Sequence, residues 1–445
     1  MKKYLIALVL AALLPIQPLV AQNFDRYFED NTLRIDYVMA GNAKEQNIYL
    51  DQLYKQERWA GRRTRLGEKF LNGNGQLTVR DHDTHEIIYV WTFSTLFQEW
   101  LLEDEAQLLS RSFEASYNIP FPKQKVDVTI ALTDKRQQPV ASMTHIVDPT
   151  DILIRRIGDN GIPYRYVWQG DRIEDRVDFA ILAEGYTEAE MDKFYADCER
   201  AVEALFAWEP FASLKEKFNV VAVAAPSLQS GPSVPNKGLW TNTAAATHYD
   251  TFYSERYLTS SRMHRIYDLL SGVPFEHIMV LANTDKYGGG GIYNQITFAS
   301  SDHPTFREVF VHEFGHSYGG LADEYAYDDM DTEWYPADTE PWEPNITTLH
   351  DFKQKWADLM PEGQPVPTPP DAAVPDFRKA RGNAEAMKRL NACTQVIGVF
   401  EGAGYQSKGC YRPAQECRMK INEVQDFCPV CTRAIRRITE FYTNH

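Results

Sequence analysis

Positive charge is scarce in this chain. Across 445 residues, 46 lysines and arginines stand against 62 aspartates and glutamates, which gives a formal net charge of −16. A protein that binds nucleic acid needs a basic surface to meet the phosphates, so this balance argues against a nucleic-acid partner. Acidic side chains in this number more often solvate a protein surface than bind a cationic ligand.

Long apolar runs are also missing. The run from Tyr4 to Leu14 is too short to cross a bilayer, and no other segment is long and apolar enough, so we expect no membrane-spanning helix. Lys2 and Lys3 precede this run and Leu19-Val20-Ala21 follows it, as in a secretory signal. We therefore expect residues 1–21 to be a signal peptide that is removed, and the mature protein to be exported to the periplasm, the cell surface or the extracellular space.

Cysteine is rare, and its distribution is uneven. Of the six cysteines, one lies apart at Cys198, and the others lie close to the C-terminus at Cys393, Cys410, Cys417, Cys428 and Cys431. Because an exported protein meets an oxidising environment, we expect disulfides. The sequence leaves a second arrangement open, in which the Cys428–Cys431 pair forms a structural zinc site with Cys410 and Cys417.

No phosphate-binding motif is present either. Gly288–Gly291 is a run of four glycines, but it lacks the lysine and hydroxyl residue that end a phosphate-binding loop, so we expect a flexible turn there. The following segment, Ile292 to Ala299, has the composition of a strand. Such a strand at the rim of a cleft is suited to bind an extended peptide by strand addition.

Residues 312–316, with the sequence His-Glu-Phe-Gly-His, carry the chemistry of a zinc hydrolase. Two histidines four residues apart lie on the same face of a helix, so His312 and His316 can bind one metal ion. Glu313 then lies beside the zinc-bound water and can act as the general base for its attack on a carbonyl. Upstream, Ser301-Asp302-His303-Pro304 predicts a helix start.

The spacing of the neighbouring residues supports a helix with two different faces. Phe306, Phe310 and Phe314 recur every fourth residue and can face a core. The two histidines of residues 312–316 lie on a different face of the helix, directed away from that core. Gly319-Gly320 ends the helix, because glycine is a poor helix former and adopts left-handed backbone readily. A catalytic zinc commonly has three protein ligands. After this break the chain can turn back, so that either Asp323 or Glu324 supplies the third metal ligand.

The chain divides by pattern into two parts beyond the signal. Residues 22–168 contain short alternating strands separated by turn residues, which predicts a β-sandwich-like N-terminal domain. Its clearest strands are Leu77–Val79, Ile87–Phe93 and Val126–Ile130. Residues 169–445 alternate strands with helices, which predicts an α/β catalytic domain.

Several motifs of the second part resemble the bacterial immunoglobulin A peptidase family of zinc endopeptidases. They are the residues 312–316 followed by Gly320 to Tyr325, Glu184 to Thr187 after a strand, Glu401 to Tyr405, Tyr411 to Pro413, Cys417 to Met419, and Cys428 to Cys431. The resemblance covers residues 176–445, and the β-rich part resembles the N-terminal domain of many members. It implies a metzincin-like zinc-protease fold and a protein or peptide substrate.

The same resemblance points to particular residues at the metal. Metzincins have their third ligand three residues after a glycine, which from Gly320 gives Asp323, with one residue inserted relative to the pattern. Metzincins also have a methionine in a turn beneath the metal, and Met419 is the candidate, although methionine also fills cores readily. Apart from the resemblance, Tyr325 and Tyr405 are candidates for assisting groups, but tyrosine is abundant in this chain and packing explains either residue equally well.

Two further hypotheses follow from the residues. The acidic stretch formed by Asp323, Glu324, Asp328, Asp329, Asp331 and Glu333 offers oxygen ligands for calcium, although its spacing is not that of an EF-hand. The alternative to an enzyme is an exported surface binding protein whose metal site is structural and closed by four protein ligands. Glu313 argues against this alternative, since a closed site gains nothing from a base.

Overall fold

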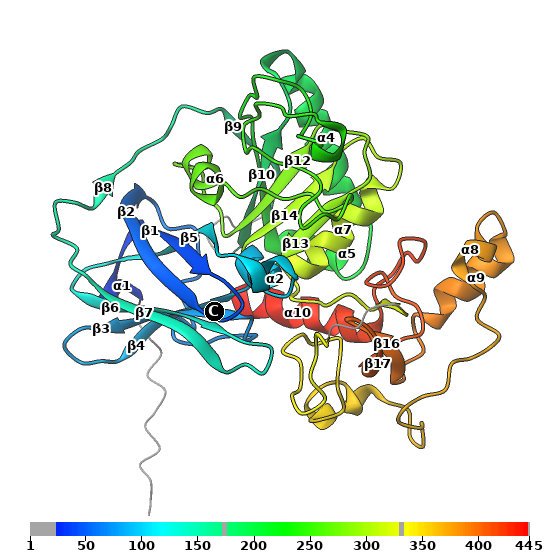
Figure 1. Ribbon diagram of the computed structural model, residues 1–445. Helices are drawn as coiled ribbons and strands as arrows, with labels where there is room; N and C mark the ends of the chain where they lie inside the picture. The colour runs from blue at the N-terminus through cyan, green and yellow to red at the C-terminus, as the bar shows by residue number, and fades with distance from the viewer. Residues whose placement is uncertain (1–23, 171–175, 329–332, 444–445) are drawn as a thin grey trace, which may run out of the picture.

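The computed structural model describes residues 24–170, 176–328 and 333–443. The predicted signal peptide, residues 1–21, lies outside the described residues. Figure 1 shows a region made mainly of β-strands, formed by the N-terminal third of the chain, beside a mixed α/β region formed by the rest. The described residues include no helix that is both long and apolar enough to cross a bilayer.

The N-terminal region consists of two four-stranded sheets, in the strand orders β5-β1-β2-β8 and β4-β3-β6-β7. Their strands are β1 (Phe28–Gly41), β2 (Gln46–Glu57), β3 (Gly75–Asp81), β4 (Ile87–Phe93), β5 (Arg111–Pro122), β6 (Val126–Thr133), β7 (Pro139–Val147) and β8 (Arg155–Arg156). Three short helices accompany them, α1 (Phe24–Tyr27), α2 (Leu96–Trp100) and α3 (Glu105–Leu108). Apolar residues of both sheets share one core, as in a β-sandwich. The three strands predicted from alternation are present as β3, β4 and β6.

The second region is built on a six-stranded sheet in the order β13-β14-β12-β10-β11-β9. Its strands are β9 (Tyr164–Gln169), β10 (Val177–Glu184), β11 (Phe218–Val223), β12 (His277–Ala282), β13 (Gly289–Ile292) and β14 (Ile296–Ser300). The four inner strands are parallel, and the edge strands β9 and β13 run antiparallel to their neighbours. The boundary expected between residues 168 and 169 falls within β9 and stays a prediction.

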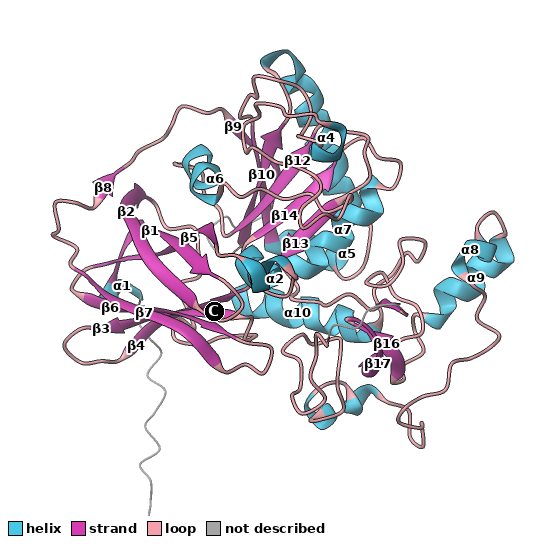
Figure 2. Ribbon diagram, in the orientation of Figure 1, coloured by secondary structure: helices cyan, strands magenta, loops and turns pink. Residues whose placement is uncertain are grey.

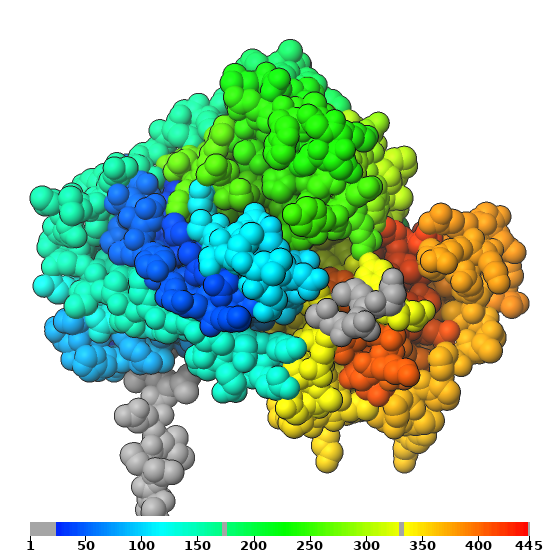
Figure 3. Space-filling model, viewed as in Figure 1, coloured from blue at the N-terminus to red at the C-terminus, as the bar shows by residue number. Residues whose placement is uncertain are grey.

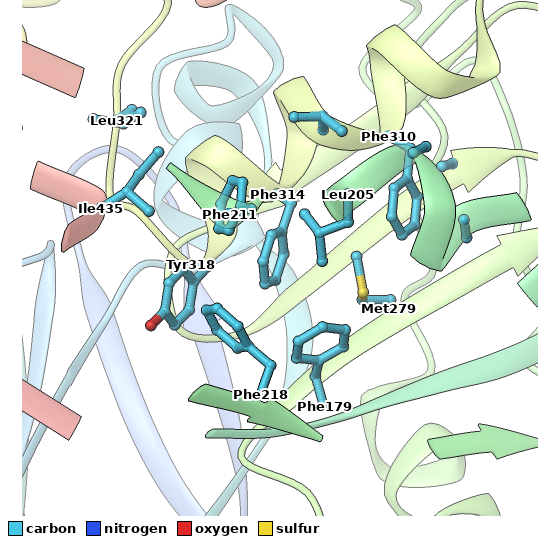
Figure 4. Packing of buried hydrophobic residues seen from close by; sticks show 14 of the residues in the cluster. Phe179, Leu205, Phe211, Phe218, Met279, Phe310, Phe314, Tyr318, Leu321 and Ile435 are labelled. Atoms are coloured by element: carbon cyan, nitrogen blue, oxygen red, sulfur yellow. The ribbon is translucent and has the colours of Figure 1, made fainter. Parts of the chain in front are cut away.

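Helices cover the two faces of this sheet unequally (Figure 2). One face packs against α4 (Met191–Phe206), α5 (Phe211–Leu214), α7 (Phe306–Ser317) and α10 (Pro429–Thr443). Figure 4 shows rings from the strands and the helices meeting in this core, including Phe179 and Phe314 with centroids 5.2 Å apart. The opposite face packs against α6 (Met263–Leu269) and the loops around it. The mixed α/β architecture predicted for this region is therefore confirmed.

The C-terminal part adds smaller elements at one end of the molecule (Figure 1). They are the three-stranded sheet of β15 (Ala326–Tyr327), β16 (Phe400–Ala403) and β17 (Tyr405–Arg412), the helices α8 (Phe377–Ala380) and α9 (Ala384–Cys393), and short 3-10 helices at Phe352–Gln354 and Ala357–Leu359. From there α10 runs back to the N-terminal region, where Phe441 and Tyr442 meet Phe70 and Trp91. Three further 3-10 helices, Glu188–Glu190, Lys215–Lys217 and Pro235–Lys237, connect elements of the six-stranded sheet region. Figure 3 shows the blue and cyan N-terminal residues packed against the green part of the second region.

The glycine run is not the flexible turn that its composition predicted. Gly289–Ile292 forms β13, which pairs with β14 at the edge of the sheet. A Cβ atom on Gly291 would lie 2.4 Å from the carbonyl oxygen of Glu313 and 2.9 Å from Cβ of His316. The strand therefore needs glycine because helix α7 crosses directly behind it, and flexibility is not the reason for the composition.

Candidate metal centre

Helix α7 presents opposite faces to the core and to the candidate site. Phe306, Phe310 and Phe314 are buried in the core beneath the sheet, as their spacing predicted. His312 and His316 lie on the other side, and their rings are 4.7 Å apart between centroids. The helix is thus fixed by its aromatic row, and this fixes the direction in which both imidazoles point.

Three side chains converge on one point. Nε2 of His312 lies 3.0 Å from Nε2 of His316, and Oδ1 of Asp323 lies 3.1 Å and 3.3 Å from these two atoms. Ligands in a tetrahedral zinc site, each about 2.0–2.1 Å from the ion, are about 3.4 Å apart. We call these three residues the His–His–Asp cluster; their spacing and donor types fit a divalent metal ion.

Each imidazole is oriented by a backbone carbonyl on its other nitrogen. Nδ1 of His312 donates to the carbonyl of Arg418 at 3.0 Å, and Nδ1 of His316 donates to that of Leu321 at 2.6 Å. A carbonyl only accepts, so in the neutral rings the proton is on Nδ1 and the lone pair is on Nε2. Outer hydrogen bonds of this kind are the usual means of aligning histidine for a metal.

The end of α7 brings Asp323 back to the histidines. Gly320 has a left-handed backbone with φ of +62°, and its amide donates to the carbonyl of His316 at 3.0 Å. The predicted break after the helix is therefore present. Asp323 is then held by two contacts with residues far along the chain, since its carbonyl accepts from the amide of Gly404 at 2.9 Å and its Oδ2 accepts from the hydroxyl of Tyr405 at 2.5 Å.

Glu324 does not join the histidines. Its amide donates to the carbonyl of Met419 at 2.8 Å, and its side chain is fully buried beside Cys431 and Asn345. Of the two acids that the sequence left open, Asp323 is thus the one that lies at the histidines. Adjacent residues in this extended turn point their side chains in opposite directions, which separates the two carboxylates.

The electrostatics of the cluster favour a cation. Burial lowers the pKa of His316, but the charge of Asp323 and its hydrogen bond outweigh burial and raise that pKa to about 9. For Asp323, burial raises the pKa of the carboxyl, but His316 and His312 together hold it well below its usual range. A buried site that binds a proton so firmly is suited to hold a metal ion in its place.

Glu313 lies against the edge strand. A Cβ atom on Gly289 would lie 2.9 Å from Oε1 of Glu313, so the carboxylate occupies the space next to β13. Burial raises the pKa of Glu313, while His312 and His316 lower it, and the net shift is upward. A carboxylate with a raised pKa is a better proton acceptor at neutral pH than an exposed one.

Some residues at the site were not found from the sequence. Glu99 of α2 lies close enough to the cluster for His316, Glu313 and Asp323 to shift its pKa, which burial in the first place raises to about 7. The hydroxyl of Tyr257 donates to Glu99. Arg256 donates to the hydroxyl of Tyr327 at 2.6 Å. No local motif marks these residues, because the fold brings them to the cluster from distant segments.

The assisting residues suggested by the sequence differ in their contacts. Tyr405 bonds Asp323 directly, whereas the hydroxyl of Tyr325 accepts a bond from Arg256 at 3.3 Å. Met419 is fully buried beneath the helix, and its sulfur would lie 2.8 Å from a Cβ atom on Gly315, between the two histidines.

The calcium hypothesis stays a prediction: Asp329 and Asp331 lie outside the described residues, and Asp323 and Glu324 belong to two different clusters.

The expectation of disulfides was wrong. All six cysteines are within the described residues, and all six are free and buried. Cys198 lies in α4, Cys393 in α9 and Cys410 in β17. The remaining three, Cys417, Cys428 and Cys431, gather around the carboxylate of Glu324. The fourth member of this group is therefore Glu324, where the sequence had suggested Cys410.

Two family models match the chain. The one described as IgA Peptidase M64 matches residues 169–375 and 370–439, and the one described as Peptidase M64 N-terminus matches residues 23–144. The first model includes α7, the turn that carries Asp323, and the segment from Cys417 to Cys431. No curated protein matches the chain.

Proposed function

The chain belongs to the IgA peptidase M64 family and is therefore a metallopeptidase; from that premise we propose that it is an exported zinc-dependent endopeptidase that hydrolyses peptide bonds in proteins. The observation that carries this proposal is the convergence of His312, His316 and Asp323 on one point beside Glu313. The proposed export depends on the predicted signal in residues 1–21.

In this proposal the three residues of the cluster hold the metal. His312 and His316 offer lone pairs on Nε2, and Asp323 offers Oδ1. Two imidazoles and one carboxylate form a ligand set common in zinc hydrolases that leave one position for substrate or water. When bound, zinc would supply Lewis acidity, which polarises the scissile carbonyl and lowers the pKa of water.

Glu313 moves the proton. Its carboxylate is partly buried beside the cluster, and its raised pKa favours taking a proton from the attacking water. The same group then carries that proton to the amine that leaves when the peptide bond breaks. In this role Glu313 acts on the substrate and the water, and it is not needed to hold the metal.

The edge strand β13 is suited to hold the substrate in an extended form. On the side away from β14, the amide of Gly289 donates to the carbonyl of Arg256 at 3.3 Å, and its carbonyl accepts from the amide of Leu258 at 3.2 Å. Because strand residues alternate, the amide and carbonyl of Gly291 also point away from β14. We propose that a substrate backbone pairs with β13 at Gly291, next to Glu313.

The metzincin-like interpretation has two supports. Asp323 follows Gly320 by three residues at the reversed end of the helix, and Met419 lies directly beneath Gly315. Both features are what the family resemblance led us to expect. The competing hypothesis of a binding protein required four protein ligands at the metal, whereas the His–His–Asp cluster contains three.

The test compares wild type with Glu313→Gln. Each purified protein is analysed for zinc by mass spectrometry and is then incubated with denatured proteins and with a peptide library. We expect wild type to cleave and the variant to lose at least about a hundredfold in rate, the lower end for loss of a general base. Zinc content should be equal in the two proteins.

Glu203→Gln provides the matched control, because it makes the same change at an exposed position on α4. This control should cleave like wild type. Turnover by Glu313→Gln within a few fold of wild type would contradict the assigned mechanism. A wild type that carries zinc and cleaves none of the substrates would contradict the endopeptidase proposal itself.

A further inference from the structure

A second group of ligand-type side chains lies behind the His–His–Asp cluster. Glu324, Cys417, Cys428 and Cys431 are all buried, and the sulfur atoms and one carboxylate oxygen lie within 4.8 Å of one another. We call these four residues the cysteine cluster. Glu324 follows Asp323 directly in the chain, so two neighbouring carboxylates serve two different clusters.

The backbone around the sulfur atoms is arranged to favour thiolates. The amide of Cys431 points to Sγ of Cys428 at 3.5 Å, and the amide of Cys428 points to Sγ of Cys417 at 3.3 Å. Cys428 and Cys431 lie at the start of α10, where unpaired amides and the helix dipole favour negative charge. The cluster thus has donors directed at its sulfur atoms from the protein itself.

Glu324 gives the independent sign that this group is suited to bind a cation. Its Oε1 accepts from Nδ2 of Asn345 and from Sγ of Cys431, each at 3.0 Å. Its Oε2 is buried and has no hydrogen-bond partner among the described residues. A buried carboxylate oxygen without a partner is destabilising unless a cation meets it. Arg412 acts on Glu324 through its charge, but no hydrogen bond joins the two side chains in the described part of the chain.

We propose that the cysteine cluster is a closed, four-coordinate structural site for Zn²⁺, with three thiolates and the Glu324 carboxylate as ligands. Thiolates select zinc over the harder cations, and four protein ligands leave no position for a substrate. A disulfide between Cys417 and Cys431, whose sulfur atoms are 3.9 Å apart, would leave Cys428 and Oε2 of Glu324 without partners.

The site also explains how Asp323 is held. The metal would tie Glu324 to the segment from Cys417 to Cys431, and the amide of Glu324 already bonds Met419 within that segment. The carbonyl of Arg418, which orients His312, belongs to the same segment. Glu324 is thus a positioning residue for the His–His–Asp cluster. This positioning role rests on the proposed function, in which Asp323 binds the catalytic metal. The binding of zinc by the cysteine cluster does not rest on it.

Metal counting separates the two sites. We expect wild type, purified without chelator, to contain two zinc ions per chain, and the double variant H312A/H316A to contain one. The double variant C428S/C431S should lose the ion of the cysteine cluster. The matched control is Cys410→Ser, which removes a buried thiol of the same C-terminal segment outside the cluster and should keep both ions.

Cobalt substitution reports on the ligands. With Co²⁺ in place of zinc, thiolate-to-metal charge-transfer absorption should persist in H312A/H316A and in Cys410→Ser, and should disappear in C428S/C431S. If the double cysteine variant does not fold, Glu324→Gln replaces it, because the amide keeps the shape of the side chain. Glu324→Gln should release its zinc to a chelator at least about tenfold faster, the lower end found for loss of even an outer partner of a metal site.

Three outcomes would overturn the proposal. One is a disulfide among the three cysteines, found by mass spectrometry after alkylation of the unreduced protein. Another is a single zinc ion per wild-type chain that disappears in H312A/H316A. The third is cobalt-loaded wild type without thiolate charge-transfer absorption. Proteolysis with one metal ion would contradict this inference alone, whereas two ions without proteolysis would contradict the proposed function alone.

Discussion

At the scale of single residues, one hydrogen bond from outside the His–His–Asp cluster controls the direction of its carboxylate. Tyr405 donates to Oδ2 of Asp323 at 2.5 Å, which leaves Oδ1 for the histidine side. Tyr405 itself adopts a left-handed backbone, with φ of +67°, and its amide bonds the carbonyl of Tyr325. This backbone bond therefore fixes the position of the residue whose hydroxyl donates to Asp323.

We predict that Tyr405→Phe weakens metal binding by about 10–100-fold, the usual effect of removing an outer partner of a ligand. Without the hydroxyl, the Asp323 carboxylate can rotate and its ionised form is less stabilised. The measurement is zinc affinity by competition with a chromophoric chelator. Tyr335→Phe is the matched control, because Tyr335 also donates to a carboxylate, Glu343, at 3.1 Å. Equal zinc affinity in Tyr405→Phe and wild type would contradict this role.

At the scale of elements, the site depends on how closely β13 approaches α7. The strand has no side chains at Gly289–Gly291, so the helix backbone lies directly against it. This packing sets the distance between the strand edge, where a peptide backbone is proposed to bind, and Glu313 on the helix.

We predict that Gly291→Ala destabilises the protein by about 1–3 kcal/mol, the typical effect of overpacking, and reduces proteolysis. The added methyl would lie 2.4 Å from the carbonyl oxygen of Glu313, and backbone atoms cannot move aside cheaply. Thermal and urea unfolding give the measurement. Gly158→Ala, where a Cβ atom meets nothing within 4 Å, should behave like wild type. A Gly291→Ala protein as stable as wild type would contradict this account of β13.

The same elements show what the sequence was able to predict. The helix of residues 312–316, its apolar row and its break at Gly319-Gly320 followed from local patterns, since spacing and glycine act locally. The glycine run was misinterpreted as a turn because the need for glycine comes from helix α7, which packs against the strand only in the folded chain. The cysteines were misinterpreted because their partner, Glu324, is close to them only in the folded chain. Glu99 and Tyr257 had no local signal at all.

At the scale of the whole molecule, the N-terminal region supports the site from one side. The amide of Ser94 donates to the carbonyl of Tyr293 at 2.9 Å, and Nδ2 of Asn294 donates to the carbonyl of Thr92 at 2.8 Å, which fixes the turn between β13 and β14. A Cβ atom on Gly320 would lie 2.5 Å from Leu71 of the N-terminal region. The two regions are therefore one structural unit around the His–His–Asp cluster.

His277 lies where these regions meet. The residue is buried, and its ring contacts Trp91 of β4, Tyr318 at the end of α7 and Tyr442 of α10. Burial lowers its pKa to about 3, against about 6.5 in an unfolded chain. Between these values the unfolded chain binds a proton that the folded chain excludes. The contribution of His277 to stability is therefore complete above pH about 6.5 and is lost as the pH falls toward 3.

We predict that His277→Phe makes the free energy of unfolding less dependent on pH. Nε2 of His277 has no hydrogen-bond partner among the described residues, so an aromatic ring of similar size should be tolerated. Below pH about 6.5, the free energy of unfolding of wild type should rise with pH more steeply than that of the variant. The difference between the two slopes should be up to about 1.4 kcal/mol per pH unit. Urea unfolding between pH 4.5 and 7.5 measures both slopes. Parallel curves for the two proteins would refute the assignment.

The bare strand β13 has a consequence for selectivity. A strand made of glycine has no side chains that could contact the side chains of a substrate. It can therefore bind only the main chain, which all peptide substrates share. If a substrate pairs with β13 as we propose, discrimination among peptide sequences falls to the neighbouring residues that carry side chains, Arg256, Tyr325 and Tyr327, in which Arg256 donates to both tyrosine hydroxyls. Under this proposal recognition has two parts: contact with the substrate main chain at the strand, and selection among sequences at the patch of Arg256, Tyr325 and Tyr327.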